Sequence, residues 1–237
     1  MGLENVSVTL VGPEYPINVG YVARLVKNFG MRKLYLVEPK FDRRVASVYA
    51  AHGSEVVEEA EEISLDQLRR RHDLLVATTA IPATRSTNVN RLSVRPEEVR
   101  QYLSSSKSAS LVLGRDTTGL RNEEVARCDL VTTIQTGTKY RTLNVSHSAA
   151  ILFYVLSKAT RERRLVPSLR ERDVFAGCAY ELAVASGLQQ FRAERLRKLA
   201  ARMAIRSQLD EKELGLLLSL MRKALATIES PHARSKT

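Results

Sequence analysis

The feature that most constrains the fold of this chain is an alternation of short apolar segments with helical patterns along its first 160 residues. The apolar segments are rich in β-branched residues and have the length of buried strands. We predict five strands, at Val6–Val11, Leu34–Val37, Leu74–Thr79, Leu111–Leu113 and Leu130–Ile134. Strands separated by helices form parallel sheets with helices on both faces, so the sequence predicts an α/β fold with a parallel sheet.

Helical patterns fill the intervals between the predicted strands. Each carries regularly spaced apolar residues, and most begin or end at a residue that is typical of a helix terminus. We predict helices at Asn18–Phe29 with Gly30 as its terminator, at Arg43–His52 ending at Gly53, after the capping-box pair Ser64 and Gln67, and at Asn144–Arg161. Helices of this length between strands again favour a parallel sheet.

The composition changes near residue 160. The segment 161–167 is basic and ends in proline, so we predict a linker there. Beyond it the patterns are helical, and two further capping-box pairs are present, Ser168 with Glu171 and Asp210 with Glu213. We therefore predict an α/β domain over residues 1–160 and a small all-helical extension over residues 168–237.

Positive charge is concentrated in the predicted helical extension. The chain has a net charge of +11, and residues 161–237 hold 16 basic and nine acidic residues, against 21 and 17 in the first 160. A charge balance of this kind favours a polyanionic partner such as nucleic acid. The helix predicted at Phe191–Arg206 has two adjoining arcs. The apolar arc is Leu196, Leu199, Ala200 and Met203, and the basic arc is Arg192, Arg195, Lys198, Arg202 and Arg206. The basic arc can contact phosphates, and a solvated helix face is the alternative.

Several classes of protein are disfavoured by what the sequence lacks. Cys128 and Cys178 form no C-x-x-C pair, which argues against a zinc ribbon or a dithiol centre and favours a reducing compartment. The longest apolar run, Ala149–Leu156, is far shorter than the about 20 residues that span a bilayer, and the N-terminus has no signal-peptide pattern. The histidines are scattered, and His147, one turn beyond Asn144, is interpreted as a surface or structural residue. We expect a soluble cytoplasmic protein that binds no metal and no membrane.

Ligands of parallel sheets bind in the loops after the strands, so these loops are the candidate sites. The loop Gly12–Gly20 has no G-x-G-x-x-G pattern, which disfavours a dinucleotide site. The loop Gly114–Arg121 has the glycine spacing of a P-loop. However, Leu120 and Arg121 stand where the phosphate-binding lysine and the magnesium-binding hydroxyl should be. The sequence therefore disfavours a nucleoside triphosphatase.

Three polar clusters remain at the ends of predicted strands. Asn18 is a candidate helix N-cap, and Arg24 can reach a phosphate held at the same helix N-terminus. Their joint position at strand ends in a basic protein predicts a polar ligand site beside a polyanion site. The clusters are Asn18, Gly20 and Arg24; Gly114, Arg115 and Asp116 with Gly119 and Leu120; and Thr142, Leu143, Asn144, Val145 and Ser146.

At these clusters the sequence resembles the SPOUT superfamily of S-adenosylmethionine-dependent RNA methyltransferases. The similarity is greatest to the TrmH-like ribose 2′-O-methyltransferases and, among them, to the TrmJ group. Two positions depart from the family pattern, because Asp116 stands where glutamate is commoner and Thr142 where serine is commoner. Both keep the functional group, so we expect altered geometry rather than lost activity. The matching motifs are Asn18–Arg24 (NVGYVAR), Leu113–Leu120 (LGRDTTGL) with Asn122–Glu124 (NEE), and Thr142–Ser146 (TLNVS).

The resemblance implies a C-terminal trefoil knot, formed by about residues 111–155, whose loops hold S-adenosylmethionine in a bent shape. It also implies a homodimer with the active site at the subunit interface, for which the helices at Asn18–Phe29 and Asn144–Arg161 are the candidate contacts. The cofactor contacts that it implies are largely main-chain and come from Thr78, Thr79, Ala80, Gly114, Ile134, Thr142, Leu143 and Asn144.

The chemistry that the resemblance implies is attack of a ribose 2′-hydroxyl on the methyl group of the sulfonium. Arg24 matches the arginine that the family assigns to activating this hydroxyl. An arginine is a poor proton acceptor because its pKa lies above about 12, so clamping a phosphate and stabilising the developing oxyanion suit it better. Asn18, Thr142 and Asn144 would orient the ribose and the loop.

The resemblance leads to a specific functional prediction with two alternatives. The leading prediction is a tRNA ribose 2′-O-methyltransferase that acts at nucleotide 32 of the anticodon loop and binds RNA through Arg115 and the basic arc. The first alternative is the same reaction on rRNA or at another tRNA position, because the three motifs do not encode the target. The second is a knotted RNA-binding protein without catalysis.

Overall fold

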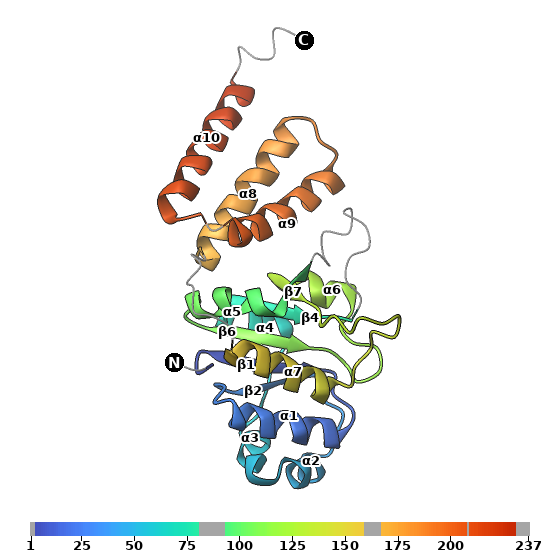
Figure 1. Ribbon diagram of the computed structural model, residues 1–237. Helices are drawn as coiled ribbons and strands as arrows, with labels where there is room; N and C mark the ends of the chain where they lie inside the picture. The colour runs from blue at the N-terminus through green and yellow to red at the C-terminus, as the bar shows by residue number, and fades with distance from the viewer. Residues whose placement is uncertain (1–2, 81–92, 159–166, 208, 231–237) are drawn as a thin grey trace. The chain divides into compact units, whose positions relative to one another are not determined.

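The computed structural model describes residues 3–80, 93–158, 167–207 and 209–230 (Figure 1). The chain divides into two compact units, residues 1–163 and 164–237. The predicted linker lies almost entirely outside the described residues, as does the end of the helix predicted to reach Arg161.

The first unit is built on a parallel sheet with the strand order β3-β2-β1-β6-β4-β7-β5. Every strand pair in it is parallel, as the alternation of strands and helices predicts. The five predicted strands are present, although β4 and β7 end one and two residues earlier than expected and β6 begins two residues earlier. The strands are β1 (Val6–Val11), β2 (Leu34–Val37), β3 (Glu61–Glu62), β4 (Leu74–Thr78), β5 (Ser93–Val94), β6 (Ala109–Leu113) and β7 (Leu130–Thr132).

Helices cover both faces of this sheet (Figure 1). On one face, Leu65 and Leu68 of α4 and Val125 of α6 pack with alternate residues of β1, β2, β4, β6 and β7. On the other, α7 packs against both α1 and α5. The helices of this unit are α1 (Pro16–Asn28), α2 (Arg43–Ala50), α3 (Ser54–Glu58), α4 (Leu65–Arg71), α5 (Pro96–Ser105), α6 (Asn122–Ala126) and α7 (Val145–Lys158), with a 3₁₀ turn at Ala51–Gly53.

Two helix boundaries differ from the sequence-based prediction by two residues, and the end of α1 and the start of α7 differ by one. Helix α1 begins at Pro16 with Tyr15 as its N-cap, so the assignment of Asn18 as N-cap is wrong. Proline is preorganised for the first helical position because its φ is fixed, and this starts the helix two residues earlier. Helix α2 ends at Ala50 because Ala51 takes a φ of 49°, which a continuing α-helix does not allow.

The second unit contains three helices among its described residues, α8 (Leu169–Ala185), α9 (Gln190–Arg206) and α10 (Glu211–Glu229). The capping boxes predicted at Ser168 and Asp210 are both formed. Helix α8 packs against α9 and α10 through small residues, chiefly Ala176, Ala179 and Ala200. The apolar arc predicted for α9 is therefore partly wrong. Leu196 and Met203 are exposed, whereas the buried residues of the helix are Ala193, Ala200, Arg202, Ala204 and Ile205.

Among the described helices, none combines the length and the apolar character that crossing a membrane requires.

Candidate active site

A pocket of about 220 Å³ opens at the carboxyl edge of the sheet, beyond the ends of β4, β6 and β7. This is the edge at which parallel sheets bind ligands, because the loops that follow neighbouring strands meet there. Three loops supply the lining, after β4 (Thr78, Thr79, Ala80), after β6 (Gly114 to Leu120) and before α7 (Ile134 and Arg141 to Leu143), together with Leu113, Thr132, Val145, Ser148 and Leu152.

The pocket collects most of the residues that were predicted to contact a cofactor. Thr78, Thr79, Ala80, Gly114, Ile134, Thr142 and Leu143 all lie in its lining. Asn144 is absent from the described lining residues, although both of its chain neighbours belong to it. The second and third sequence clusters are therefore brought together in one place.

Hydrogen bonds join the first cluster to the other two. Asn144 Nδ2 donates to Asn18 Oδ1 over 3.0 Å, and Asn18 Nδ2 donates to Asp116 Oδ1 over 2.5 Å. Asn18 is buried at the start of α1, so this chain of amide and carboxylate groups is fixed on a helix. One residue from each motif thus takes part in a single hydrogen-bonded network.

Asp116 also completes the N-terminus of α1. Its Oδ2 accepts hydrogen bonds from the main-chain N–H groups of Glu14 and Tyr15, at 3.2 and 3.3 Å. An anionic oxygen at this position satisfies donors that a helix leaves unpaired and interacts favourably with the helix dipole. The carboxylate of the second motif therefore holds the segment that leads into α1, and Tyr15, the N-cap residue, makes no side-chain capping hydrogen bond.

Asn144 plays the corresponding part at the start of α7. Its Oδ1 accepts hydrogen bonds from the N–H and the hydroxyl of Ser146, at 2.8 and 2.7 Å. The side-chain amide of Asn144 is therefore engaged through both of its polar atoms: the oxygen binds Ser146 of α7, and the nitrogen binds Asn18. Such double use fixes the orientation of the loop that carries Thr142.

The loop after β6 folds tightly against itself beside the pocket. A Cβ atom on Gly114 would lie 2.2 Å from the main-chain carbon of Gly119, so only glycine fits there. Gly119 has a φ of 67°, and the loop closes through main-chain hydrogen bonds between Arg115 and Gly119. The backbone geometry of this loop therefore explains why glycine occupies positions 114 and 119.

Arg115 is held inside this loop rather than offered to a ligand. Its guanidinium forms a two-pronged ion pair with Glu124, at 2.9 Å to each oxygen, and its side chain is only 10% exposed. This pairing raises the pKa of Arg115 further. Burial alone would raise the pKa of Glu124, but hydrogen bonds from Arg115 and the N–H of Arg121 outweigh it and lower that pKa. Most of the guanidinium is therefore engaged within the protein, and the contact of Arg115 with RNA stays a prediction.

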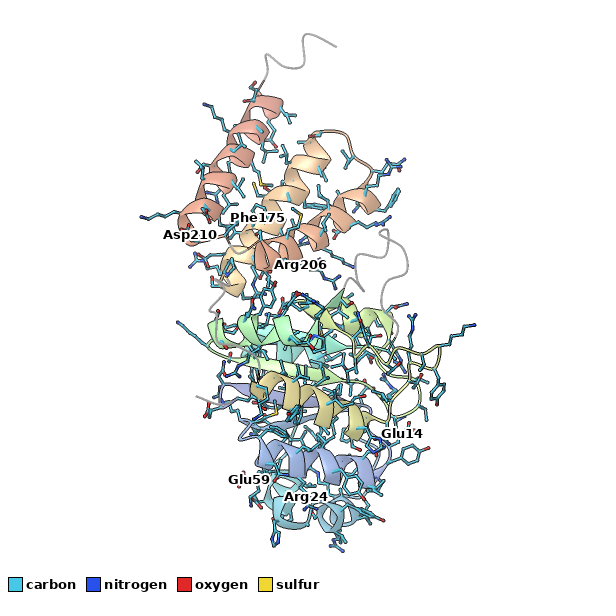
Figure 2. The ribbon with its side chains drawn as sticks, viewed as in Figure 1. Glu14, Arg24, Glu59, Phe175, Arg206 and Asp210 are labelled. Atoms are coloured by element: carbon cyan, nitrogen blue, oxygen red, sulfur yellow. The ribbon has the colours of Figure 1, made fainter. Side chains whose placement is uncertain are left out.

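Arg24 lies apart from the pocket of its own chain. Six residues at about 100° each place it about 120° around the helix from Asn18. Arg24 is exposed and is absent from the described lining residues. Its main chain packs against Gly53, where α3 begins, and Figure 2 shows its side chain on that side of α1.

The predicted basic arc of α9 is largely but not fully exposed. Arg192, Arg195, Lys198 and Arg206 are exposed, and Figure 2 labels Arg206 near the end of the helix. Arg202 is buried and has partners within the protein, so it does not belong to a solvent-facing arc. His147 is exposed, as the sequence interpretation expected.

Sequence reasoning missed two features of the site. Arg141 lines the pocket, and Asp116 binds the main chain that leads into α1. The Gly-Thr-Lys-rich loop before Arg141 could have indicated it. The contact between Asp116 and Tyr15 spans 101 residues of sequence, so no local pattern could show it. In the described part of the chain, no group of three or more histidine, cysteine or acidic side chains is arranged to hold a metal ion.

Comparisons with known proteins identify the family of this chain and several relatives. Residues 5–154 match the model of the SpoU rRNA Methylase family. The chain is 36% identical over 153 residues to the tRNA (cytidine-2′-O-)-methyltransferase TrmJ of Sulfolobus acidocaldarius, which covers 64% of each chain and so less than two thirds of that relative. It is 34% identical over 170 residues to the protein of the same name from Methanocaldococcus jannaschii, covering 70% of this chain and 74% of that one.

A solved structure has the same fold. The crystal structure of TrmJ from Z. mobilis ZM4 superposes with a TM-score of 0.66 at 19% identity, covering 94% of this chain and 99% of the other.

Proposed function

The chain belongs to the SpoU rRNA methylase family, and on that basis we propose that it is a tRNA ribose 2′-O-methyltransferase that uses S-adenosylmethionine. The relatives named as tRNA (cytidine-2′-O-)-methyltransferases support the choice of tRNA over rRNA. We place the target at nucleotide 32 of the anticodon loop, as the resemblance to the TrmJ group implies. The observation that carries the proposal is the network Asn144–Asn18–Asp116 beside the pocket, which unites all three motifs.

The pocket fits the proposed cofactor. Its lining combines apolar side chains, among them Leu113, Leu120 and Ile134, with threonine hydroxyls and main-chain groups. Apolar side chains suit the flat face of a purine, and hydroxyl and main-chain groups suit its edge and the ribose. When bound, S-adenosylmethionine supplies a methyl group on a positively charged sulfur. The trefoil knot implied by the resemblance stays a prediction.

The chain's own residues would supply position and charge. The network fixes Asn18, Asn144 and the Thr142 loop. A ribose held there would already be positioned beside the methyl donor, so the reaction step would cost little further translational and rotational entropy. We assign to Arg24 the clamping of a substrate phosphate and the stabilisation of the oxyanion that develops on the ribose.

Because Arg24 does not line the pocket of its own chain, we propose that it completes the site of a second copy. Arg24 lies one turn beyond the exposed Tyr21, whose ring packs edge-on against Tyr49 of α2. The neighbouring helix α7 exposes Ile151 and Tyr154. An exposed apolar surface of this kind is typical of a subunit interface, and α1 and α7 are the helices that the resemblance implies for the homodimer.

The helical unit is proposed to bind the body of the RNA. Its exposed cations Arg192, Arg195, Lys198 and Arg206 can follow phosphates without reading bases.

The direct test is to incubate the protein with S-adenosylmethionine and with bulk tRNA and rRNA that lack the modification, and to map 2′-O-methyl groups. We expect one new methyl group at nucleotide 32 of tRNA. Methylation elsewhere in tRNA, or in rRNA, would support the proposed reaction but would show that nucleotide 32 is not its target. Failure to bind S-adenosylmethionine in calorimetry would favour the non-catalytic RNA-binding alternative.

The role of Arg24 has its own test. Arg24→Ala should abolish methyl transfer and leave the dissociation constant for S-adenosylmethionine within a few-fold, because Arg24 lies outside the pocket of its own chain. Arg24→Lys keeps the charge but loses the planar fork, so we expect partial activity. Normal turnover by Arg24→Ala would remove Arg24 from the mechanism.

A further inference from the structure

The segment between β7 and α7 carries a second hollow that the proposed reaction does not use. This hollow lies along residues 133–141 and is lined by Thr133, Ile134, Gln135, Thr136, Gly137, Thr138, Lys139 and Arg141. It shares Ile134 and Arg141 with the pocket at the strand ends. A ligand group on this segment would therefore lie next to the proposed methyl-donor site.

The ring of Tyr140 stands out from this segment. Its side chain is 80% exposed, the most exposed among the large apolar and aromatic residues of the described chain. The main chain beneath it is held in place, because the hydroxyls of Thr138 and Thr136 donate to the Tyr140 carbonyl oxygen at 2.9 and 3.4 Å. Gly137 permits the turn by adopting a φ of 72°. An ordered backbone thus presents an aromatic ring to solvent.

Two cations flank this ring. Lys139 and Arg141 are both exposed, and no ion pair among the described residues involves either of them. Arg115, by contrast, lines the neighbouring pocket but is neutralised by Glu124. An exposed aromatic ring between two uncompensated cations is the arrangement with which proteins hold single-stranded nucleic acid, since bases stack on the ring and phosphates pair with the cations.

We propose that Lys139, Tyr140 and Arg141 form a contact strip for unpaired RNA beside the reaction site. Tyr140 stacks on a base adjacent to the target nucleotide, and Lys139 and Arg141 pair with the phosphates on either side of it. The proposal rests on the proposed function for its choice of RNA. It adds a stacking contact that the low aromatic content of the chain does not suggest.

The strip also predicts the form of RNA that is accepted. Bases inside a double helix are stacked on each other and cannot stack on Tyr140 without being unpaired. The strip therefore favours a loop over a duplex, whatever the sequence of the loop.

The absence of tryptophan from the sequence permits a sharp test. Tyr140→Trp places a single tryptophan in the strip, and Val48→Trp provides a control on α2 at a residue of similar exposure, 77% against 80% for Tyr140. Each variant is titrated with a hairpin RNA that has an unpaired loop and with a blunt duplex, and binding is followed in parallel by anisotropy of labelled RNA.

We expect the hairpin to quench the tryptophan emission of Tyr140→Trp at the concentrations at which anisotropy rises, with no such change in Val48→Trp and none with the duplex. Hairpin binding that leaves the emission of Tyr140→Trp unchanged would overturn the proposal, as would equal quenching by the duplex. An emission change in Tyr140→Trp that follows protein concentration without RNA would assign this position to contact with a second copy and would also overturn it.

Substitutions in the full-length chain give a second readout. Tyr140→Phe should bind the hairpin like the unaltered protein, whereas Tyr140→Ala should bind it roughly 5- to 100-fold more weakly, the range found for loss of one stacked base. Lys139→Gln with Arg141→Gln should reduce the slope of log affinity against log salt by about 1 to 2. S-adenosylmethionine affinity of Tyr140→Ala should be unchanged, because Tyr140 is outside the pocket lining.

The outcomes for the strip and for the proposed function can be told apart. Hairpin-dependent quenching in a protein that transfers no methyl group would sustain the strip and reject the enzyme. Methyl transfer with wild-type KM and kcat in Tyr140→Ala would reject the strip and sustain the enzyme.

Discussion

At the scale of single residues, Asp116 has more structural connections than its place in a loop suggests. Its two oxygens accept from the Asn18 amide and from two main-chain N–H groups at the start of α1. The sequence comparison identifies Asp116 only as a variant of a commoner glutamate. The structure shows what the carboxylate does, which is to tie the loop after β6 to α1.

Asp116→Ala should lower the free energy of unfolding by about 1–3 kcal/mol, because it leaves the partly buried amide of Asn18 without its acceptor. Urea denaturation measures this directly. Asp116→Glu keeps the carboxylate, so it should lose less stability than Asp116→Ala. Equal stability of Asp116→Ala and the unaltered protein would show that these hydrogen bonds are not formed in solution.

The ion pair of Arg115 and Glu124 predicts a pH effect. The pKa of Glu124 is lowered in the folded protein, so its contribution to stability is fully present above its unfolded pKa of about 4.3 and is lost as pH falls through the folded value. Glu124→Gln should cost about 2–4 kcal/mol near pH 7, because the largely buried Arg115 would be left without its charge partner.

The check is the difference in unfolding free energy between pH 7 and pH 4, obtained from urea titrations at both values. This difference should be smaller in Glu124→Gln than in the unaltered protein. An identical pH dependence in the two proteins would contradict the assigned pKa direction.

At the scale of elements, the sequence predicts the long strands and most helices correctly because their signals are local. The spacing of apolar residues, the capping boxes and the glycine after α1 each involve residues of a single short segment. Strands β3 and β5 have two residues each and exist only through pairing with β2 and β7, so no local pattern shows them. The ion pair of Arg115 with Glu124 was not visible in the sequence for the same reason, because its partner lies in another element.

Helix α9 carries a testable electrostatic prediction. Arg195→Gln with Lys198→Gln should weaken tRNA binding and reduce its salt slope by about 2, since two exposed phosphate contacts are removed. Arg44→Gln with Lys107→Gln is the matched control, because it removes two exposed cations from the first unit. Equal loss of affinity in both double variants would point to net charge rather than to α9.

At the scale of the whole molecule, we propose that two copies of the chain build each active site, with Arg24 from one copy and the network around Asn144 from the other. If they do, variants in the two residues should complement each other. A mixture of Arg24→Ala and Asn144→Ala chains should regain up to about a quarter of wild-type activity if subunits exchange freely, because half the dimers would hold one intact site.

Each variant alone should be inactive, which provides the baseline. A mixture that stays inactive after subunit exchange has been confirmed by mass spectrometry would place Arg24 and Asn144 in the same subunit's site.

The most direct measurement compares methyl transfer to two tRNA transcripts that differ in one oxygen atom. One carries ribose at nucleotide 32 and the other 2′-deoxyribose, and radiolabelled S-adenosylmethionine reports the transfer. We predict incorporation into the first transcript and none into the second. Equal incorporation into both would contradict the account, because the methyl group would then be going to an atom other than this 2′-oxygen.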